Sequence, residues 1–271
     1  MQHAGLMTLG TLLLPYISLG KKVQNVGLQL YTVKDAMLSD AKSTLKALSE
    51  IGFKELESAR STKGNFYGLS PREVKSICND LGMTMRSGHV HIDENWEQSI
   101  EQAVEAGQEY LVCSSLPSNG QTIDNYKKVA EIFTKAAEDC NKAGLKFAYH
   151  NHDYEFEKVG GKILYDVLLE ETDPKLVLME LDLGWVVVTG NDPLDYLEKH
   201  PGRFPLWHLK DMKKEHPEST EFGKGLIDIK KMMQIAHSSG MKYFFVEQEE
   251  YANDPMSSIK HNFDYLMKLD Y

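Results

Sequence analysis

Four pairs of polar residues, each spaced two apart, recur along the chain. They are His89 and His91, His150 and His152, Glu180 and Asp182, and His208 and Lys210. Successive side chains of a β-strand point to opposite faces, so the two members of a pair share a face if these segments are strands. Imidazole and carboxylate groups gathered on one buried face are costly unless a cation compensates them. The pattern therefore predicts a site for a divalent metal, with Mn²⁺, Zn²⁺, Co²⁺ or Mg²⁺ as the ions that suit such mixed ligands.

The residues between the members of each pair indicate which face the pairs occupy. Three of these four residues are apolar, and they are Val90, Leu181 and Leu209, with Asn151 as the exception. In a closed barrel, one face of each strand packs against helices while the other points to the barrel interior. The polar pairs are therefore predicted to point inward, toward a common axis, and Asn151 to lie where its strand becomes a loop.

The segments that carry the pairs belong to a regular alternation of strand-like and helix-like runs. Apolar strands alternating with helices indicate a parallel sheet covered by helices, and eight such units can close a barrel of about 250 residues. The predicted fold is a single (β/α)8 TIM barrel of the α/β class. Strands are predicted at 26–33, 53–59, 83–92, 109–115, 145–152, 175–184, 203–212 and 242–249, and helices at 41–51, 71–81, 96–106, 123–143, 163–171, 193–199, 227–239 and 255–268.

A doubly wound open sheet is the alternative fold for this alternation. That fold usually has a glycine-rich phosphate-binding turn after its first strand, whereas residues 32–38 read TVKDAML. In a barrel the active site lies at the C-terminal ends of the strands, which is where the polar pairs fall. Glu247 ends the eighth predicted strand and joins them.

The composition excludes some classes of function. The 271 residues carry a formal net charge of −10, and a protein that binds duplex nucleic acid needs a basic face, so we expect no nucleic-acid partner. The three cysteines form no CxxC pair, which argues against a zinc knuckle or a disulfide framework.

The first 23 residues differ from the rest. Residues 4–19 are apolar or small, and Lys21 and Lys22 follow. This stretch is too short for a transmembrane helix but suits the apolar region of a signal peptide, although no basic segment precedes it. We predict a leader at 1–23 and one barrel domain at 24–271, which would act in the periplasm or outside the cell and would not contact a membrane. A short buried N-terminal helix on a cytoplasmic protein is the alternative.

Segments at the ends of strands five to eight resemble the xylose isomerase-like family of barrels, which includes sugar isomerases and epimerases, inosose dehydratase and DNA repair enzymes of the endonuclease IV type. The matching segments are 149–156, 180–185, 208–211 and 246–248, together with the glycines of the loop 222–228. The repair enzymes of this family carry more metal ligands and a basic surface, so this acidic chain fits the sugar-processing branch.

The resemblance also implies which residues hold the metal. Sugar epimerases of the family use a Glu on strand five, an Asp on strand six, a His on strand seven and a Glu on strand eight. Asp182, His208 and Glu247 match the last three positions, whereas His150 stands in place of the Glu. Glu180 and His152 are the other candidates to complete the site. This departure puts simple epimerisation in doubt and favours elimination. Trp185 stands where the epimerases have a substrate-binding His, and it would offer a flat surface for a sugar ring.

These residues together predict an isomerase or epimerase that acts on a sugar or keto-sugar through an enediolate. The metal would stabilise the enediolate, Glu180 or His152 would act as the base, and Lys210 or His91 would supply charge. One alternative is a lyase or dehydratase that uses the same intermediate, and another is a non-catalytic sugar-binding barrel. The residues expected to contact the sugar are His89, His91, Trp185, Glu57 and Tyr31, with Glu57 alternatively paired with Arg60 or Arg86.

Overall fold

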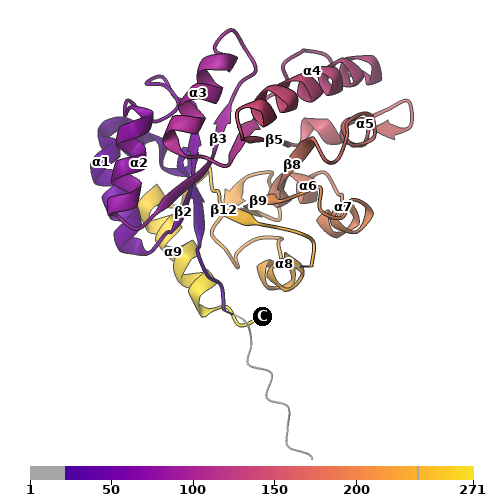
Figure 1. Ribbon diagram of the computed structural model, residues 1–271. Coiled ribbons are helices and arrows are strands. Elements are labelled where there is room, and N and C mark those ends of the chain that lie inside the picture. The colour runs from indigo at the N-terminus through magenta and orange to yellow at the C-terminus, as the bar shows by residue number, and fades with distance from the viewer. Residues whose placement is uncertain (1–21, 237) are drawn as a thin grey trace, which may run out of the picture.

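The computed structural model describes residues 22–236 and 238–271. Eight parallel strands in this part of the chain form a closed barrel, and Figure 1 shows the helices outside the ring of strands. The predicted (β/α)8 barrel is thereby confirmed. In barrel order the strands are β1 (Gly27–Gln29), β12 (Tyr243–Val246), β9 (Leu206–Leu209), β8 (Val177–Asp182), β5 (Lys146–His150), β4 (Tyr110–Cys113), β3 (Thr84–Val90) and β2 (Glu55–Ala59).

The helices follow the strands in the order that the sequence predicts, with one addition, a short helix directly after the sixth barrel strand that the sequence does not predict. No helix in the described part of the chain is long and apolar enough to cross a bilayer. The predicted leader at 1–23 lies outside the described residues, except for its last two. The helices are α1 (Lys34–Ile51), α2 (Pro71–Asp80), α3 (Trp96–Ala106), α4 (Ile123–Lys142), α5 (Leu164–Glu171), α6 (Leu183–Val188), α7 (Pro193–Lys199), α8 (Ile229–Ala236) and α9 (Pro255–Lys268).

Seven of the eight barrel strands end two to four residues earlier than the sequence predicts, and at two of these ends a side chain caps a helix. The first strand stops at Gln29, whose side chain accepts a hydrogen bond from the backbone N–H of Tyr31 and so begins the 3-10 helix η1 (Leu30–Val33). The sixth barrel strand stops at Asp182, whose carboxylate accepts from the N–H of Trp185 and begins α6. Polar side chains at these positions satisfy helix N–H groups that would otherwise lack partners.

Two short β-hairpins lie outside the barrel sheet, in loops that follow the C-terminal ends of β5 and β9. One pairs β6 (Lys158–Val159) with β7 (Lys162–Ile163), and it follows the 3-10 helix η2 (Tyr154–Phe156). The other pairs β10 (Asp211–Met212) with β11 (Ser219–Thr220) directly after β9.

The barrel interior is apolar at its base and polar near its mouth. A small cluster of buried residues, separate from the main core between strands and helices, forms the base. Its members are Tyr110, Val112, Ala148, Leu206 and Phe245. The rings of Phe245 and His208 meet edge to face, with their centroids 6.3 Å apart. The polar residues therefore lie directly above a layer of buried apolar side chains that excludes water.

Candidate metal centre and substrate cavity

Four side chains from four strands converge near the mouth of the barrel. His150 and Asp182 are the last residues of β5 and β8, His208 lies in β9, and Glu247 directly follows β12. We call these four residues the upper cluster. Each offers one ligand atom within 4.8 Å of the ligand atoms of the other three, and all four residues are buried. These are the four residues that the sequence predicts as metal ligands.

The donor atoms of the upper cluster fit a divalent cation. His150 Nε2 lies 3.1 Å from His208 Nδ1 and 3.5 Å from Asp182 Oδ2, and Glu247 Oε2 lies 2.8 Å from His208 Nδ1. Asp182 Oδ1 caps α6, whereas Asp182 Oδ2 is buried, has no hydrogen bond of good geometry and lies 2.9 Å from the Lys210 ammonium. Two buried carboxylate oxygens beside two imidazole nitrogens are a donor set that fits a divalent ion.

A second group of residues lies directly beneath the upper cluster. We call Glu57, His89 and Glu180 the lower cluster. Glu57 Oε1 lies 2.7 Å from His208 Nε2 and accepts a hydrogen bond from the side chain of Gln29 at 2.8 Å. His89 Nε2 lies 2.7 Å from Glu180 Oε2 and 3.1 Å from Glu57 Oε1. The ring of His208 therefore joins the two clusters, with Nδ1 above and Nε2 below.

Glu57 orients the ring of His208 from below. Burial opposes ionisation of Glu57, but the charges of His89 and His208 and their hydrogen bonds hold its pKa below the usual range. Burial also opposes a charge on His208, but the carboxylates of Glu180, Glu247 and Glu57 raise the pKa of His208 well above its usual value. An ionised Glu57 accepts the proton of His208 Nε2, and a cation would take the place of the second ring proton, on Nδ1. Carboxylates that orient metal-binding histidines in this way commonly support metal affinity.

We expect Glu57→Gln to weaken metal binding although Glu57 is not a ligand. An amide carries no charge to hold the Nε2 proton, so affinity should fall by about 10- to 100-fold. Isothermal titration of the metal-free protein with Mn²⁺ measures the change. Glu55→Gln on the same strand is the matched control, because Glu55 pairs with Arg86 at 2.6 Å, away from the clusters. Equal affinities for both variants would contradict the role given to Glu57.

The depth of Glu57 and Glu180 differs from the expectation. Glu57 was expected at the mouth, in contact with the sugar, but its side chain is completely buried below His208 and pairs with neither Arg60 nor Arg86. The strand β2 continues for two residues beyond Glu57, which places this carboxylate one layer down. Glu180 is equally buried, two residues before the end of β8.

Lys210 lies among carboxylates beside the upper cluster. Its Nζ is 2.9 Å from Asp182 Oδ2, 2.8 Å from Glu247 Oε2 and 2.7 Å from Glu249 Oε1. Burial disfavours the charged amine, but these three carboxylates raise the pKa of Lys210 well above its usual value. The Trp185 ring lies 4.7 Å from the ammonium, so Trp185 packs against Lys210. Neither residue lines the cavity described next.

A cavity of about 240 Å³ opens above the clusters. Three of the residues expected to contact a sugar line it, as does the candidate base His152. Sequence reasoning missed Arg60, Ser114 and Glu249, although Glu249 continues the spacing of two from Glu247. The lining consists of Tyr31, Ala59, Arg60, His89, His91, Ser114, His150, His152, Glu247 and Glu249.

His152 is a neutral histidine at the wall of this cavity. Burial, together with the charge of Lys210, lowers the pKa of His152 to about 4. Its Nδ1 lies 3.2 Å from the Tyr154 hydroxyl, and the two rings stack with their centroids 5.2 Å apart. An imidazole held in this way keeps a defined orientation and an unprotonated nitrogen at neutral pH.

The loop that carries His152 depends on a buried carboxyl group. Glu155 accepts a hydrogen bond from the N–H of His152 at 2.9 Å, and it also bonds the Tyr149 hydroxyl. Burial raises the pKa of Glu155 from 4.5 to about 7. Between these values the folded protein keeps a proton that the unfolded chain has released. The stability that this group contributes is therefore complete below pH 4.5 and is lost as the pH rises toward 7.

We expect Glu155→Gln to remove this part of the pH dependence of folding. The wild type should lose up to about 3 kcal/mol of stability between pH 4.5 and 7 relative to the variant. Urea unfolding at a series of pH values measures the difference. Glu157→Gln, two residues further along the same loop, is the control, and a variant whose pH profile parallels the wild type would refute the assignment.

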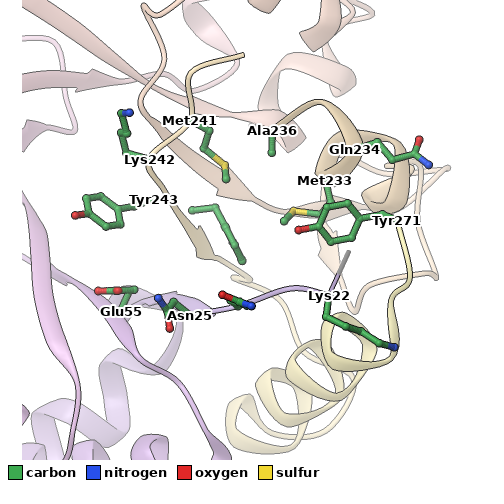
Figure 2. Close-up of a pocket in the computed structure, with 12 residues that line it drawn as sticks. Lys22, Asn25, Glu55, Met233, Gln234, Ala236, Met241, Lys242, Tyr243 and Tyr271 are labelled. Atoms are coloured by element: carbon green, nitrogen blue, oxygen red, sulfur yellow. The ribbon is translucent and has the colours of Figure 1, made fainter. Parts of the chain in front are cut away.

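A larger cavity, of about 560 Å³, lies at the opposite end of the barrel (Figure 2). Asn25, Glu55 and Tyr243, which lie before or at the starts of β1, β2 and β12, are among its lining residues. Glu55 is paired with Arg86, and the Tyr243 hydroxyl donates to Glu109 at 2.9 Å. Barrel enzymes carry their chemistry at the C-terminal ends of the strands, so we assign the candidate site to the other end.

Comparisons with known proteins agree with this architecture. The profile of the xylose isomerase-like TIM barrel family matches residues 45–269. An inosose dehydratase from Geobacillus thermodenitrificans (strain NG80-2) is 32% identical over 142 residues, which are 46% of this chain and 46% of that protein. The chain spans about half the length of the curated relatives it matches.

Solved structures extend the likeness over most of the chain. A sugar phosphate isomerase/epimerase from Parabacteroides distasonis ATCC 8503 superposes with a TM-score of 0.81 and 28% identity, covering 90% of this chain and 97% of that one. The IOLI protein, solved with a bound zinc atom, has a TM-score of 0.71 over 89% of this chain and 96% of its own. Its identity is only 14%, so this second likeness concerns the fold alone.

Proposed function

The chain belongs to the xylose isomerase-like TIM barrel family, and we propose that it is a metal-dependent enzyme that removes a proton next to the carbonyl group of a sugar or keto-sugar. The observation that carries this proposal is the convergence of the upper cluster from four strands, directly beneath a cavity that the neutral His152 lines. A binding module would not require ligand atoms gathered in this way.

The upper cluster would hold the cation. His150, Asp182, His208 and Glu247 offer two nitrogens and two carboxylate oxygens, a set that suits Mn²⁺, Zn²⁺ or Co²⁺ and, less well, Mg²⁺. A divalent ion at this position would supply Lewis-acid stabilisation of the negative charge that develops when the proton leaves.

The residues in and around the cavity would supply the base, a contact to the substrate and support for the metal ligands. His152 lines the cavity in its neutral form and would accept the proton, while the Tyr154 hydroxyl holds its ring in place. His89 also lines the cavity and, anchored on Glu180, would bind a substrate oxygen. Lys210 is too buried to reach the substrate, so its role would be to hold Asp182 and Glu247 in position.

Two reactions can follow once the proton next to the carbonyl group has been removed, and they differ in the fate of the resulting carbanion. Its reprotonation gives an isomer or epimer, whereas departure of a group from the neighbouring carbon gives elimination. His150 replaces the strand-five carboxylate of the family's epimerases, which favours elimination, and the relatives named inosose dehydratase agree with that direction. Dehydration or another elimination is therefore the second candidate reaction.

Proton exchange tests the proposal. The metal-loaded protein is incubated in D₂O with a panel of free sugars, keto-sugars, inososes and glycosides, and the products are followed by NMR. We expect the signal of the proton next to the carbonyl to disappear for at least one substrate, and the mass of the product to distinguish isomerisation from elimination. Chelator-treated protein is the control. Saturable binding of a sugar without any exchange would indicate a sugar-binding barrel instead.

A further inference from the structure

We infer that the substrate of this site carries a second ring, joined to the reacting sugar, and that this ring binds in an adjoining cavity formed by the segments that follow β1 and β2. This inference rests on the proposed function and narrows its substrate class from free sugars to glycosides and disaccharides. We call the cavity of about 240 Å³ above the clusters the first cavity, and the neighbouring cavity of about 410 Å³ the second cavity.

The two cavities adjoin each other at the mouth of the barrel. Tyr31, Arg60 and His91 line both of them. Residues of the upper and lower clusters line the first cavity, whereas none of them lines the second. Pockets for small ligands commonly have volumes of about 300–1,000 Å³, so the first cavity alone is smaller than this range and the second cavity brings the site into it. A ligand held above the upper cluster and longer than one sugar ring would therefore continue into the second cavity.

Two tyrosines from different segments line the second cavity. Tyr31 lies in η1, directly after β1, and Tyr67 lies in the loop between β2 and α2. Tyr31 is 37% exposed, and the Lys34 ammonium lies 4.0 Å from the centre of its ring. An exposed aromatic ring that a neighbouring cation holds in place offers a flat apolar surface, on which the ring of a sugar or of an aromatic group can pack.

Tyr67 has two features that a ligand in the second cavity would explain. Its side chain is only 4% exposed, and its buried hydroxyl has no hydrogen-bond partner among the residues that the structure describes. Its backbone has a φ of 54°, a left-handed conformation that is rare for a bulky residue and that occurs preferentially at functional sites. Burial, together with Tyr31 and Glu247, raises the pKa of Tyr67 above its usual value, so the hydroxyl keeps its proton. A ligand oxygen would supply the missing acceptor.

The positive charges beside the second cavity already have partners. Arg60 pairs with Asp93, and the Lys34 ammonium lies over the Tyr31 ring. Leu38 adds an apolar side chain to the lining. A neutral ring therefore fits the second cavity better than an anionic group, and binding of an anion is an outcome that the experiment has to separate.

Matched ligands that differ by one ring test the inference on the full metal-loaded chain. Isothermal titration compares D-fructose with lactulose, in which a galactose ring is joined to fructose, and methyl β-D-glucopyranoside with phenyl β-D-glucopyranoside. We expect at least one two-ring ligand to bind about tenfold more tightly than its one-ring partner. A gain for lactulose alone assigns the second cavity to a sugar ring, and a gain for the phenyl glucoside alone assigns it to an aromatic group. The inference fails if neither two-ring ligand binds more tightly than its partner, or if D-fructose 6-phosphate binds more tightly than both.

Substitutions in the second cavity locate the binding of the second ring. Tyr31→Ala should remove the tenfold preference, whereas Tyr31→Phe keeps the aromatic ring and should retain it. Tyr67→Phe removes only the unpaired hydroxyl, and it should weaken the two-ring ligand several-fold while the one-ring ligand binds as before. Tyr243→Phe is the control, because it removes a hydroxyl at the opposite end of the barrel. A preference that survives both Tyr31→Ala and Tyr67→Phe would overturn the assignment to the second cavity.

The failure of this inference can be told apart from failure of the proposed function, because the titrations measure binding and do not depend on turnover. If no sugar exchanges a proton in D₂O but a two-ring ligand binds tenfold more tightly than its partner, the proposed reaction is lost and the second cavity remains a binding site for a ring. If free sugars exchange a proton and no two-ring ligand binds more tightly, the proposed function stands and this inference is lost.

Discussion

Asp182→Ala and Glu247→Ala should each abolish stoichiometric metal binding and lower any metal-dependent turnover by at least about 100-fold. Each substitution removes an anionic ligand from a site in which four ligand atoms lie within 4.8 Å of one another. Metal ions contribute several kcal/mol to the stabilisation of developing charge, and each 1.4 kcal/mol corresponds to a factor of ten in rate. Elemental analysis of the purified variants, followed by titration with Mn²⁺ and Zn²⁺, measures the loss.

Asp182→Ala removes a helix cap as well as a metal ligand, because Asp182 Oδ1 caps α6. Its control variant must therefore also remove a helix cap. Asp192 caps α7 by accepting a hydrogen bond from the N–H of Leu194 at 2.9 Å, and it lies outside both clusters. Asp192→Ala should therefore lose a similar amount of stability, about 1 kcal/mol, and keep its metal. If Asp182→Ala and Glu247→Ala bind metal as the wild type does, the upper cluster is not the metal site.

Lys210→Met should destabilise the metal-free protein strongly, by about 3–5 kcal/mol. The ammonium lies within 2.9 Å of the carboxylates of Asp182, Glu247 and Glu249. Methionine fills much of the same volume but leaves buried carboxylates without a counter-charge. Urea unfolding of the metal-free proteins measures the loss of stability.

Added metal should restore part of the stability of Lys210→Met, because a cation in the upper cluster again compensates Asp182 and Glu247. Lys213→Met is the matched control: Lys213 is exposed and pairs with Glu218 at 2.6 Å, and exposed pairs contribute less than about 1 kcal/mol. A loss for Lys210→Met no greater than that for Lys213→Met, or a loss that saturating Mn²⁺ leaves unchanged, would refute the role of Lys210 as the counter-ion of this site.

Lys210 and the lower cluster together suggest how the fold tolerates so many buried charges. The upper cluster has Lys210 at its side and the ring of His208 beneath it, and His208 in turn rests on Glu57. Each charged group therefore meets at least one group of opposite charge, which is the condition for keeping ionised residues away from water. Substitutions in one cluster should accordingly affect the other through His208.

Much of this arrangement follows from the sequence alone. Alternating strand and helix signals led to the barrel, and the spacing of two identified the side chains that point inward. The ligand set His150, Asp182, His208 and Glu247 came from strand ends together with a family resemblance, and the structure gathers these four residues. Such local rules succeed because the direction of a side chain on a strand is fixed by the pleat of the backbone itself.

The depth of each residue in the barrel was decided only by the tertiary structure. Alternation fixes the face of a side chain, but its height along the barrel axis depends on how neighbouring strands are staggered. Strand β2 shifts register against β3 between Leu56 and Glu57, and Glu57 lies beneath His208 instead of at the mouth. Trp185 likewise lies in the first turn of α6, which Asp182 caps, and it packs on Lys210 and does not line the cavity. These positions follow from contacts between residues far apart in the chain, which no local pattern records.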